Sequence, residues 1–217
     1  EWYREHSDNG RCVVCCDSGR SVRREKHPTY KAQRTEKDPG ALDALKSLQD
    51  RLRENGTKLC QVEGWEGDDV IATLTRQAWP EDVSIIGSEK DFFCLIDDDR
   101  VHLVGKNGAI TSEECFDKFG VAPSQMTDFL AMVGDAADNI DGCPNCGPGR
   151  AAKLLGMFGS LAEARSAAFC GTLKPGDIKG VGETTLTSLA HWDPTRALEL
   201  VRMNDRLPVS LMELLGD

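Results

Sequence analysis

The sequence predicts an α/β fold: a mostly parallel sheet flanked by helices, followed by a helical region. Short apolar runs such as CVVCC (12–16), VSIIG (83–87) and VHLV (101–104) are typical of buried strands. Segments with apolar residues every three or four positions alternate with them, as in sheets covered by helices. After Asp138 the pattern becomes helical. We therefore predict an α/β core over residues 1–138, incomplete at its N-terminus, and a helical region over residues 139–217.

The first forty residues predict one strand and little other regular structure. Residues 1–10 have the pattern of a helix end and a turn, and the strand 12–16 follows at once. Because a parallel-sheet domain rarely starts on a helix tail, we expect a further strand upstream. Residues 20–40 are polar, strongly charged and without apolar periodicity, which predicts a mobile loop or a helix that orders late.

The middle of the chain predicts alternating helices and strands. Leucines at positions 42, 45, 48 and 52 indicate a helix over 41–55, and Gly56 fits its end. A short strand over 58–64 and a helix over 67–79 follow. A capping box at 111–114 begins a helix that ends at Gly120, and Pro123 begins the next one.

Composition narrows the class of protein. Apolar residues make up 40% and charged residues 29% of the chain, as in ordinary soluble domains. No apolar run approaches the roughly 18 residues of a membrane span, and no signal peptide is recognisable. We expect a cytoplasmic, monomeric protein without membrane contact.

The nine cysteines predict neither disulfides nor zinc. Their number is odd and their spacing irregular. Cys12 and Cys15 lie in a predicted strand, where positions three apart face opposite sides. Cys143 and Cys146 flank a turn and could face each other, but burial as small apolar side chains is the commoner fate of free cysteines.

Eight acidic residues form four short clusters at ends of predicted strands or at the start of a helix. They are Asp17; Glu66, Asp68 and Asp69; Glu89 and Asp91; and Asp135 and Asp138. Carboxylates that gather at one place need a compensating cation. Oxygen ligands without histidine favour Mg²⁺ or Mn²⁺, and a pair of such ions is typical of phosphodiester hydrolysis. Scattered surface acids are the alternative interpretation.

Basic residues are concentrated despite the net charge of −10. Seven of them lie between positions 20 and 37, among them Arg20, Arg23, Lys31 and Arg34. Such a stretch can bind phosphates in an acidic protein, or it can be a solvated charged loop.

A glycine- and proline-rich turn follows the last acidic cluster. It contains Gly142, Gly147 and Gly149, and a helix beginning at Ala151 comes next, with Arg150 and Lys153 near its start. Helix N-termini and turn amides bind phosphate without reading bases. A weaker version occurs at 179–182, where a packing turn is the expected role.

The order of these motifs resembles the 5′-nuclease superfamily: the 5′→3′ exonuclease domain of bacterial DNA polymerase I, phage 5′-exonucleases and flap endonucleases. GWEGDDVIATL is similar to the family's Glu-x-Asp-Asp helix, and GSEKDFFCLI to its strand-end acid pair. MVGDAADNIDGCPNCGPGRAAKLL is similar to its Gly-Asp-x-x-Asp-Asn segment and helix-hairpin-helix, and HPTYKAQR to its Tyr-Lys-x-x-Arg. The resemblance covers residues 12–206 and implies a PIN-like, resolvase-like core.

The resemblance also implies roles for individual residues. Asp17, Glu66 and Asp68 would hold one Mg²⁺ or Mn²⁺, with Asp69 nearby, and Glu89, Asp91, Asp135 and Asp138 would hold a second. Lys31 and Arg34 would act on the scissile phosphate. K⁺ would bind carbonyl oxygens of the hairpin. DNA with a 5′ end or a 5′ flap would contact eight further residues: Arg20, Arg23, Tyr30, Gly142, Gly147, Gly149, Arg150 and Lys153.

Two departures from the family pattern bear on activity. The family's leading Val-Asp-Gly strand is absent from this sequence, and Glu89 stands where Asp is usual. The main hypothesis is a two-metal 5′→3′ exonuclease or 5′-flap endonuclease in DNA replication or repair. A non-catalytic module that binds branched DNA is one alternative, and a PIN-type ribonuclease is another.

Overall fold

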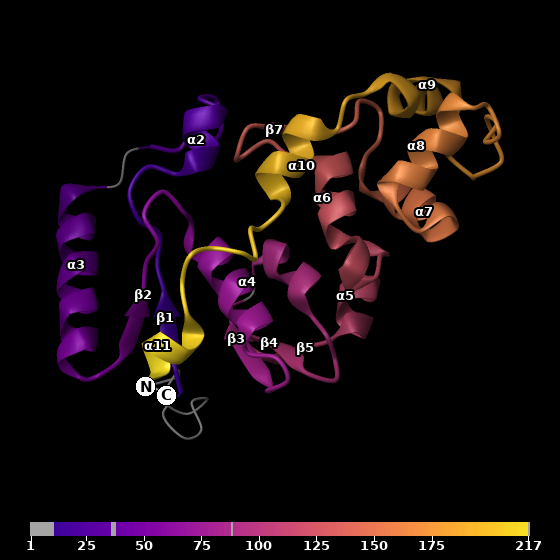
Figure 1. Cartoon of the computed structure of the whole chain (residues 1–217). Helices are drawn as coiled ribbons and strands as arrows, with labels where there is room; N and C mark the ends of the chain where they lie inside the picture. Colours follow the sequence, from indigo (N-terminus) through magenta and orange to yellow (C-terminus); the bar gives the residue numbers. More distant parts are fainter. Residues whose placement is uncertain (1–10, 36–37, 88, 217) are drawn as a thin grey trace. The chain divides into compact units, whose positions relative to one another are not determined.

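The computed structural model describes residues 11–35, 38–87 and 89–216. The chain divides into two compact units, neither of which is continuous in sequence (Figure 1). Unit 1 comprises Glu1–Pro28, Arg34–Ile86 and Met203–Asp217, and unit 2 comprises Thr29–Gln33 and Gly87–Arg202. The predicted helix end over residues 1–10 lies outside the described residues.

Unit 1 is built on two short parallel strands, β1 (Val13–Cys15) and β2 (Lys58–Cys60), with Val14 opposite Leu59. A crossover that contains α2 (Val22–Lys26) and α3 (Pro39–Glu54) joins them. Helix α4 (Gly67–Gln77) and strand β3 (Val83–Ile86) follow. The parallel pair with a helical crossover is the arrangement that the alternating pattern predicts.

The end of the chain returns to unit 1 and runs along α4. Leu207 packs with Cys60, Val70 and Leu74 in one buried cluster. The hydroxyl of Thr73 donates to the carbonyl of Asn204 at 3.0 Å and accepts from the amide of Leu207 at 3.2 Å. Helix α11 (Leu211–Leu215) ends this segment. The last residues are therefore part of the core of unit 1.

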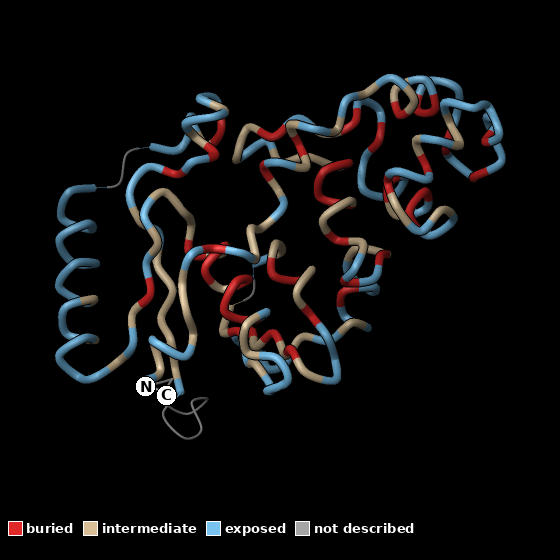
Figure 2. The backbone as a smooth tube through the Cα atoms, viewed as in Figure 1, coloured by how far each residue is buried: buried red, intermediate tan, exposed pale blue. Residues whose placement is uncertain are grey.

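Helix α3 carries an exposed apolar stripe. Its leucines at positions 42, 45 and 48 are 45%, 43% and 51% exposed. Among the described residues α3 contributes no buried side chain, and Figure 2 shows it almost entirely in the colour of exposed residues. The helix begins two residues before the predicted start at 41, because the carboxylate of Asp38 accepts from the amide of Ala41 and caps it.

Unit 2 begins with a turn of 3₁₀ helix, η2 (Lys90–Leu95), and an antiparallel hairpin of β4 (Val101–Gly105) and β5 (Gly108–Ile110). Helix α5 (Ser112–Phe119) starts with the predicted capping box, in which Thr111 and Glu114 cap each other's amides, and ends at Gly120. A 3₁₀ turn, η3 (Pro123–Gln125), leads into the largely buried helix α6 (Met126–Val133).

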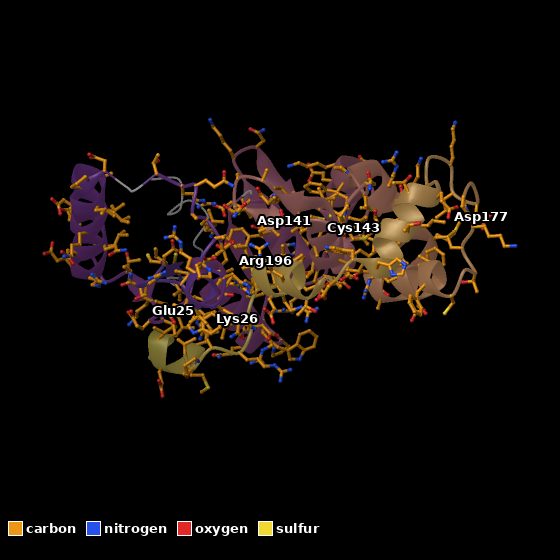
Figure 3. All side chains as sticks on the ribbon, turned by 90° about the horizontal axis from the view of Figure 1, so that it is seen from above. Glu25, Lys26, Asp141, Cys143, Asp177 and Arg196 are labelled. Carbon is orange, nitrogen blue, oxygen red and sulfur yellow. The ribbon has the colours of Figure 1, made fainter. Side chains whose placement is uncertain are left out.

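The remainder of unit 2 is helical apart from one small hairpin. Strands β6 (Gly134–Asp135) and β7 (Ile140–Asp141) pair antiparallel. Four helices follow: α7 (Pro148–Phe158), α8 (Leu161–Phe169), α9 (Glu183–His191) and α10 (Thr195–Val201). In Figure 3 the labelled side chains of Arg196 on α10 and Asp141 on β7 lie next to each other, and their closest atoms are 3.4 Å apart.

The predicted α/β class is confirmed, with parallel pairing at β1–β2 and antiparallel pairing in the two hairpins. The predicted boundary after Asp138 remains a prediction, because compactness divides the chain at other positions. No helix among the described residues is both long and apolar enough to cross a membrane.

Replacing Gly142 by alanine is expected to destabilise the protein by about 1–3 kcal/mol, the usual cost of overpacking. A Cβ at this position would lie 2.5 Å from the carbonyl of Val133 and 2.6 Å from that of Met132. Gly156→Ala on α7 is the matched control, since its Cβ meets nothing within 4 Å and alanine raises helix propensity by about 1 kcal/mol. Urea unfolding measures both variants, and equal stabilities would contradict the close contact.

Candidate metal centre and nucleic-acid interface

The first acidic group of unit 1 surrounds the beginning of α4. Asp17 comes directly after β1, and its Oδ1 accepts a hydrogen bond of 2.9 Å from the amide of Gly67, the first residue of α4. Glu66 immediately precedes that helix, and Asp68 lies in its first turn. Asp17 is exposed, and the other two side chains are partly buried. The amides of a helix N-terminus stabilise such negative charges. Asp17 is thus bonded to the start of α4, where Glu66 and Asp68 also lie, and their joint binding of a metal ion stays a prediction.

Asp69 differs from these neighbours because it is fully buried. Its two carboxylate oxygens accept from the guanidinium of Arg23 at 2.6 and 2.7 Å. They also accept from the amide of Glu66 at 3.3 Å and from that of Asn204 at 2.7 Å.

The prediction that Arg23 contacts DNA requires correction. Arg23 is only 9% exposed and forms a bidentate ion pair with Asp69, a geometry that gives strong charge-assisted hydrogen bonds. Its guanidinium also lies 3.7 Å from the carboxylate of Glu66. Arg20, by contrast, is exposed.

The second acidic group lies entirely in unit 2. Glu89 and Asp91 flank Lys90 at the start of η2, while Asp135 and Asp138 lie on and just after β6. The ammonium of Lys90 contacts the carboxylate of Asp135 at 2.5 Å. Burial raises the pKa of Asp91; Lys90 opposes this rise, and the charges of Asp135, Asp138 and Glu89 add to it. The other three carboxylates therefore lie close enough to Asp91 to act on its pKa, and their joint binding of a metal stays a prediction.

The charge balance of this group is uneven. Burial alone would raise the pKa of Asp135, but the hydrogen bond and charge of Lys90 and the amides of Ala137 and Asp138 outweigh it and lower that pKa. Lys90 thus compensates Asp135 more fully than Asp91. In the part of the chain that the structure describes, no three acidic, histidine or cysteine side chains are arranged as a ready-made metal cage. Burial is the largest cause of the raised pKa of Asp91, and the charges of the neighbouring carboxylates are smaller contributions in the same direction.

Lys31 lies at the second acidic group. Its amide donates to the carbonyl oxygen of Asp138 at 3.0 Å, although the two residues are far apart in sequence. Its ammonium lies 4.8 Å from the centroid of the Tyr30 ring. Arg34 belongs to unit 1 and is exposed.

Side chains that the sequence analysis did not single out hold Lys31 in place. The side-chain amide of Asn139 donates to the backbone carbonyl of Thr29 at 3.0 Å. The side-chain amide of Gln33 donates to the side-chain oxygen of Asn139 at 3.2 Å. Arg196 donates to both Thr29 and the carbonyl of Asn139 at 3.0 Å. Lys90 was also overlooked, although its position between two predicted metal ligands was a usable signal.

The predicted DNA contact of Tyr30 also requires correction. Only 3% of Tyr30 is exposed, and it packs with Ala131, Ile140, Ala197 and Leu200. Its aromatic ring therefore belongs to the core of unit 2 and anchors the turn that carries Lys31.

In the hairpin before α7, the predicted DNA-contacting residues divide into three kinds. Gly142 is packed against α6, whereas Gly147 and Gly149 are exposed, with open space where a Cβ would lie. Arg150 donates to the carbonyls of Asn145 and Gly180, and Lys153 donates to that of Lys179. Both basic side chains remain exposed while they hold the second turn against the first.

The two turns enclose an open hollow of about 500 Å³, lined among others by Asn145, Arg150, Gly180 and Thr184. The hydroxyl of Thr185 donates to the carbonyl of Asn145 at 3.2 Å and so closes one side. This agrees with the packing role predicted for the turn at 179–182.

The described cysteines are free thiols. Burial, together with neighbouring cysteines, raises the pKa of Cys15 to about 12, so this thiol stays protonated at neutral pH. Cys143 and Cys146 are buried and face each other. A hydrogen bond between them raises the pKa of Cys143 and lowers that of Cys146. Zinc binding needs further ligands beside such a pair, and its absence here stays a prediction from the sequence.

Comparison with known proteins identifies the family of the chain. Residues 2–120 match the family model of the 5′-3′ exonuclease N-terminal resolvase-like domain, and residues 121–213 match that of the 5′-3′ exonuclease C-terminal SAM fold. DNA polymerase I of Deinococcus radiodurans is 37% identical over 161 residues, which are 72% of this chain and 16% of that protein. DNA polymerase I of Rhizobium leguminosarum is 33% identical over 204 residues, which are 92% of this chain and 19% of that protein.

The chain thus spans about a fifth or less of the length of these two relatives. Among solved structures, T5 5′-exonuclease with bound zinc is 25% identical, with a TM-score of 0.73 over 94% of this chain and 78% of that one. The catalytic core of Rad2 in complex with DNA substrate shares the fold, with a TM-score of 0.53 at 18% identity over 82% of this chain and 56% of that one. The matches to both family models show that the chain belongs to the 5′-3′ exonuclease family.

Proposed function

We propose that this chain is a divalent-metal-dependent nuclease that hydrolyses DNA in the 5′→3′ direction or at 5′ flaps, in replication or repair. Family membership supports the activity, and one contact in the structure carries the assignment of the site. The amide of Lys31 bonds to the carbonyl of Asp138, which joins the basic Tyr-Lys-x-x-Arg turn to the second acidic group. A phosphate near that turn would meet a cation and a carboxylate set together.

The donor sets suit divalent cations. Asp17, Glu66 and Asp68 would hold one Mg²⁺ or Mn²⁺, and Glu89, Asp91, Asp135 and Asp138 would hold a second. Their hard oxygens fit these ions, and the raised pKa of Asp91 reflects a group that a cation would relieve. Divalent ions have been observed in T5 5′-exonuclease. When bound, such ions supply a hydroxide near neutral pH and stabilise a leaving oxygen.

The side chains of the protein contribute orientation and charge. The Lys31 ammonium would donate to the phosphate oxygens as negative charge develops on them. The contacts from Asn139, Gln33 and Arg196 fix the turn around it, and this preorganisation matters because small displacements cost rate. Arg34 would act on the same phosphate.

Duplex DNA would contact the hairpin through its backbone. The open approaches at Gly147 and Gly149 allow close contact with phosphates at the start of α7, and the exposed Arg150 and Lys153 add positive charge. Carbonyl oxygens of the hairpin would bind a K⁺ ion. One of these carbonyls, that of Asn145, accepts a hydrogen bond from the positively charged guanidinium of Arg150. Action as a monomer in the cytoplasm belongs to the same proposal.

The first prediction concerns the metal. A 5′-flap substrate should be cut in Mg²⁺ or Mn²⁺ and left intact in excess EDTA, because the proposed mechanism takes its hydroxide from metal-bound water. A duplex RNA of the same sequence is the control for a ribonuclease. Cleavage that persists in EDTA rules out the metal mechanism. Tight binding of the flap without cutting in any divalent ion supports the non-catalytic alternative instead.

The second prediction concerns Lys31. Lys31→Ala should lower the single-turnover rate by about 10²-fold or more, the usual loss for one donor to a developing charge. Lys26→Ala, on the exposed end of α2, is the control for general attraction of DNA. Measurement at saturating enzyme separates chemistry from binding. If Lys31→Ala raises only the dissociation constant, Lys31 attracts DNA and takes no part in the chemical step.

The third prediction concerns pH. Because the folded-state pKa of Asp91 is raised, its charge destabilises the fold at neutral pH, and this penalty fades as the pH falls through that pKa. The pKa of Asp135 is lowered, so this residue stays charged over the same range. The gain in melting temperature from Mg²⁺ should therefore be larger at about pH 7 than at about pH 5. Asp91→Asn should reduce this difference, and Asp117→Asn, an exposed acid on α5, should not. Thermal unfolding with and without Mg²⁺ at both pH values measures these gains. If the gain in melting temperature depends on pH equally in wild type and in Asp91→Asn, the assignment of Asp91 as a metal ligand is wrong.

A further inference from the structure

The buried carboxylate of Asp69 has no capacity left for a metal ion. A carboxylate offers about four acceptor positions, and the four hydrogen bonds to Asp69 occupy them: two from Arg23 and one each from the amides of Glu66 and Asn204. Asp69 is 0% exposed, so no water-facing edge remains. Asp68, the preceding residue, is partly exposed.

Ligation of a metal by Asp69 would also disturb the charge balance of unit 1. Arg23 is 9% exposed, and Asp69 is its bidentate partner. Moving the carboxylate toward an ion would leave a buried guanidinium without that partner, which is among the more destabilising changes in a protein interior. The metal would have to compete with this ion pair.

The partners of Asp69 come from three separate segments of unit 1. Arg23 lies on α2, Glu66 precedes α4, and Asn204 belongs to the returning C-terminal segment. The Arg23 guanidinium is also 3.7 Å from the Glu66 carboxylate. Through one side chain, the start of α4, which carries Glu66 and Asp68, is fixed to two other segments.

We propose that Asp69 is a positioning residue, paired with Arg23, and that metal binding in unit 1 falls to Asp17, Glu66 and Asp68. This inference rests on the proposed function for the identity of the metal site. It replaces the expectation that Asp69 lies beside the ion as part of the acidic set. The acidic Asp68–Asp69 pair then divides into one ligand and one structural ion-pair partner.

The test compares Asp68→Asn with the charge-balanced double variant Arg23→Gln/Asp69→Asn. In the double variant a neutral amide pair replaces the ion pair. The one side-chain oxygen left at position 69 can keep the shorter hydrogen bond, that of 2.7 Å from the amide of Asn204, while the longer one of 3.3 Å from the amide of Glu66 is lost. Mn²⁺ binding to the whole chain is measured by calorimetry. Asp68→Asn should weaken binding by at least about 10-fold, the lower range for loss of even an outer-shell partner. The double variant should bind Mn²⁺ close to wild type, and a loss equal to that of Asp68→Asn overturns the proposal.

A second measurement, thermal unfolding in EDTA, tests the ion pair between Asp69 and Arg23 independently of metal binding. Asp69→Asn and Arg23→Gln alone should each lower the melting temperature, and the double variant should recover much of the loss because neither charge remains unpaired. Losses that simply add in the double variant overturn the pairing. If wild type binds no Mn²⁺, the proposed function fails, while the unfolding measurements still decide whether Asp69 and Arg23 act as a pair.

Discussion

A single buried carboxylate organises unit 1. Asp69 lies at the start of α4 and is completely removed from solvent, so its charge is tolerable only because every acceptor position is satisfied. The requirement acts in both directions. Arg23 must be buried to meet Asp69, and the chain near Asn204 must return to offer its amide. The acids beside Asp69 are placed by this constraint, and their exposure distinguishes groups that can take a ligand from the one that cannot.

Features that depend on near neighbours in sequence were predictable. The capping box at Thr111 and Glu114, the helix end at Gly120 and the amphipathic helix after Glu66 all follow from interactions within about four residues. The positions of the acids that follow strands were predictable for a related reason, because the end of a strand places the next residue at that edge of the sheet. In unit 2 the charges of Glu89, Asp135 and Asp138 reach Asp91, where they add to the larger effect of burial on its pKa.

Features that depend on distant partners were not predictable. Tyr30 lies in a polar, charged stretch, and only its contact with α6 and α10 makes it a core residue. Arg23 appeared to be one of several basic residues, and nothing local distinguishes it from Arg20 or Arg24. The leucines of α3 show the converse, since an apolar stripe usually predicts burial and this one is exposed among the described residues. In each case the deciding interaction joins segments far apart in sequence.

The interleaving of the two units has a consequence for synthesis on the ribosome. The chain passes between the units four times, after residues 28, 33, 86 and 202. The amide of Asn204 meets Asp69 across 135 positions of sequence, and Thr29–Gln33 waits for Asn139 and Arg196. Unit 1 therefore cannot be complete before the segment from Met203 has been made, and such late closures of long loops are the kind of contacts that slow folding. Until they form, the emerging chain lacks both the Asn204 amide that donates to Asp69 and the contacts of Asn139 and Arg196 with the Thr29–Gln33 turn.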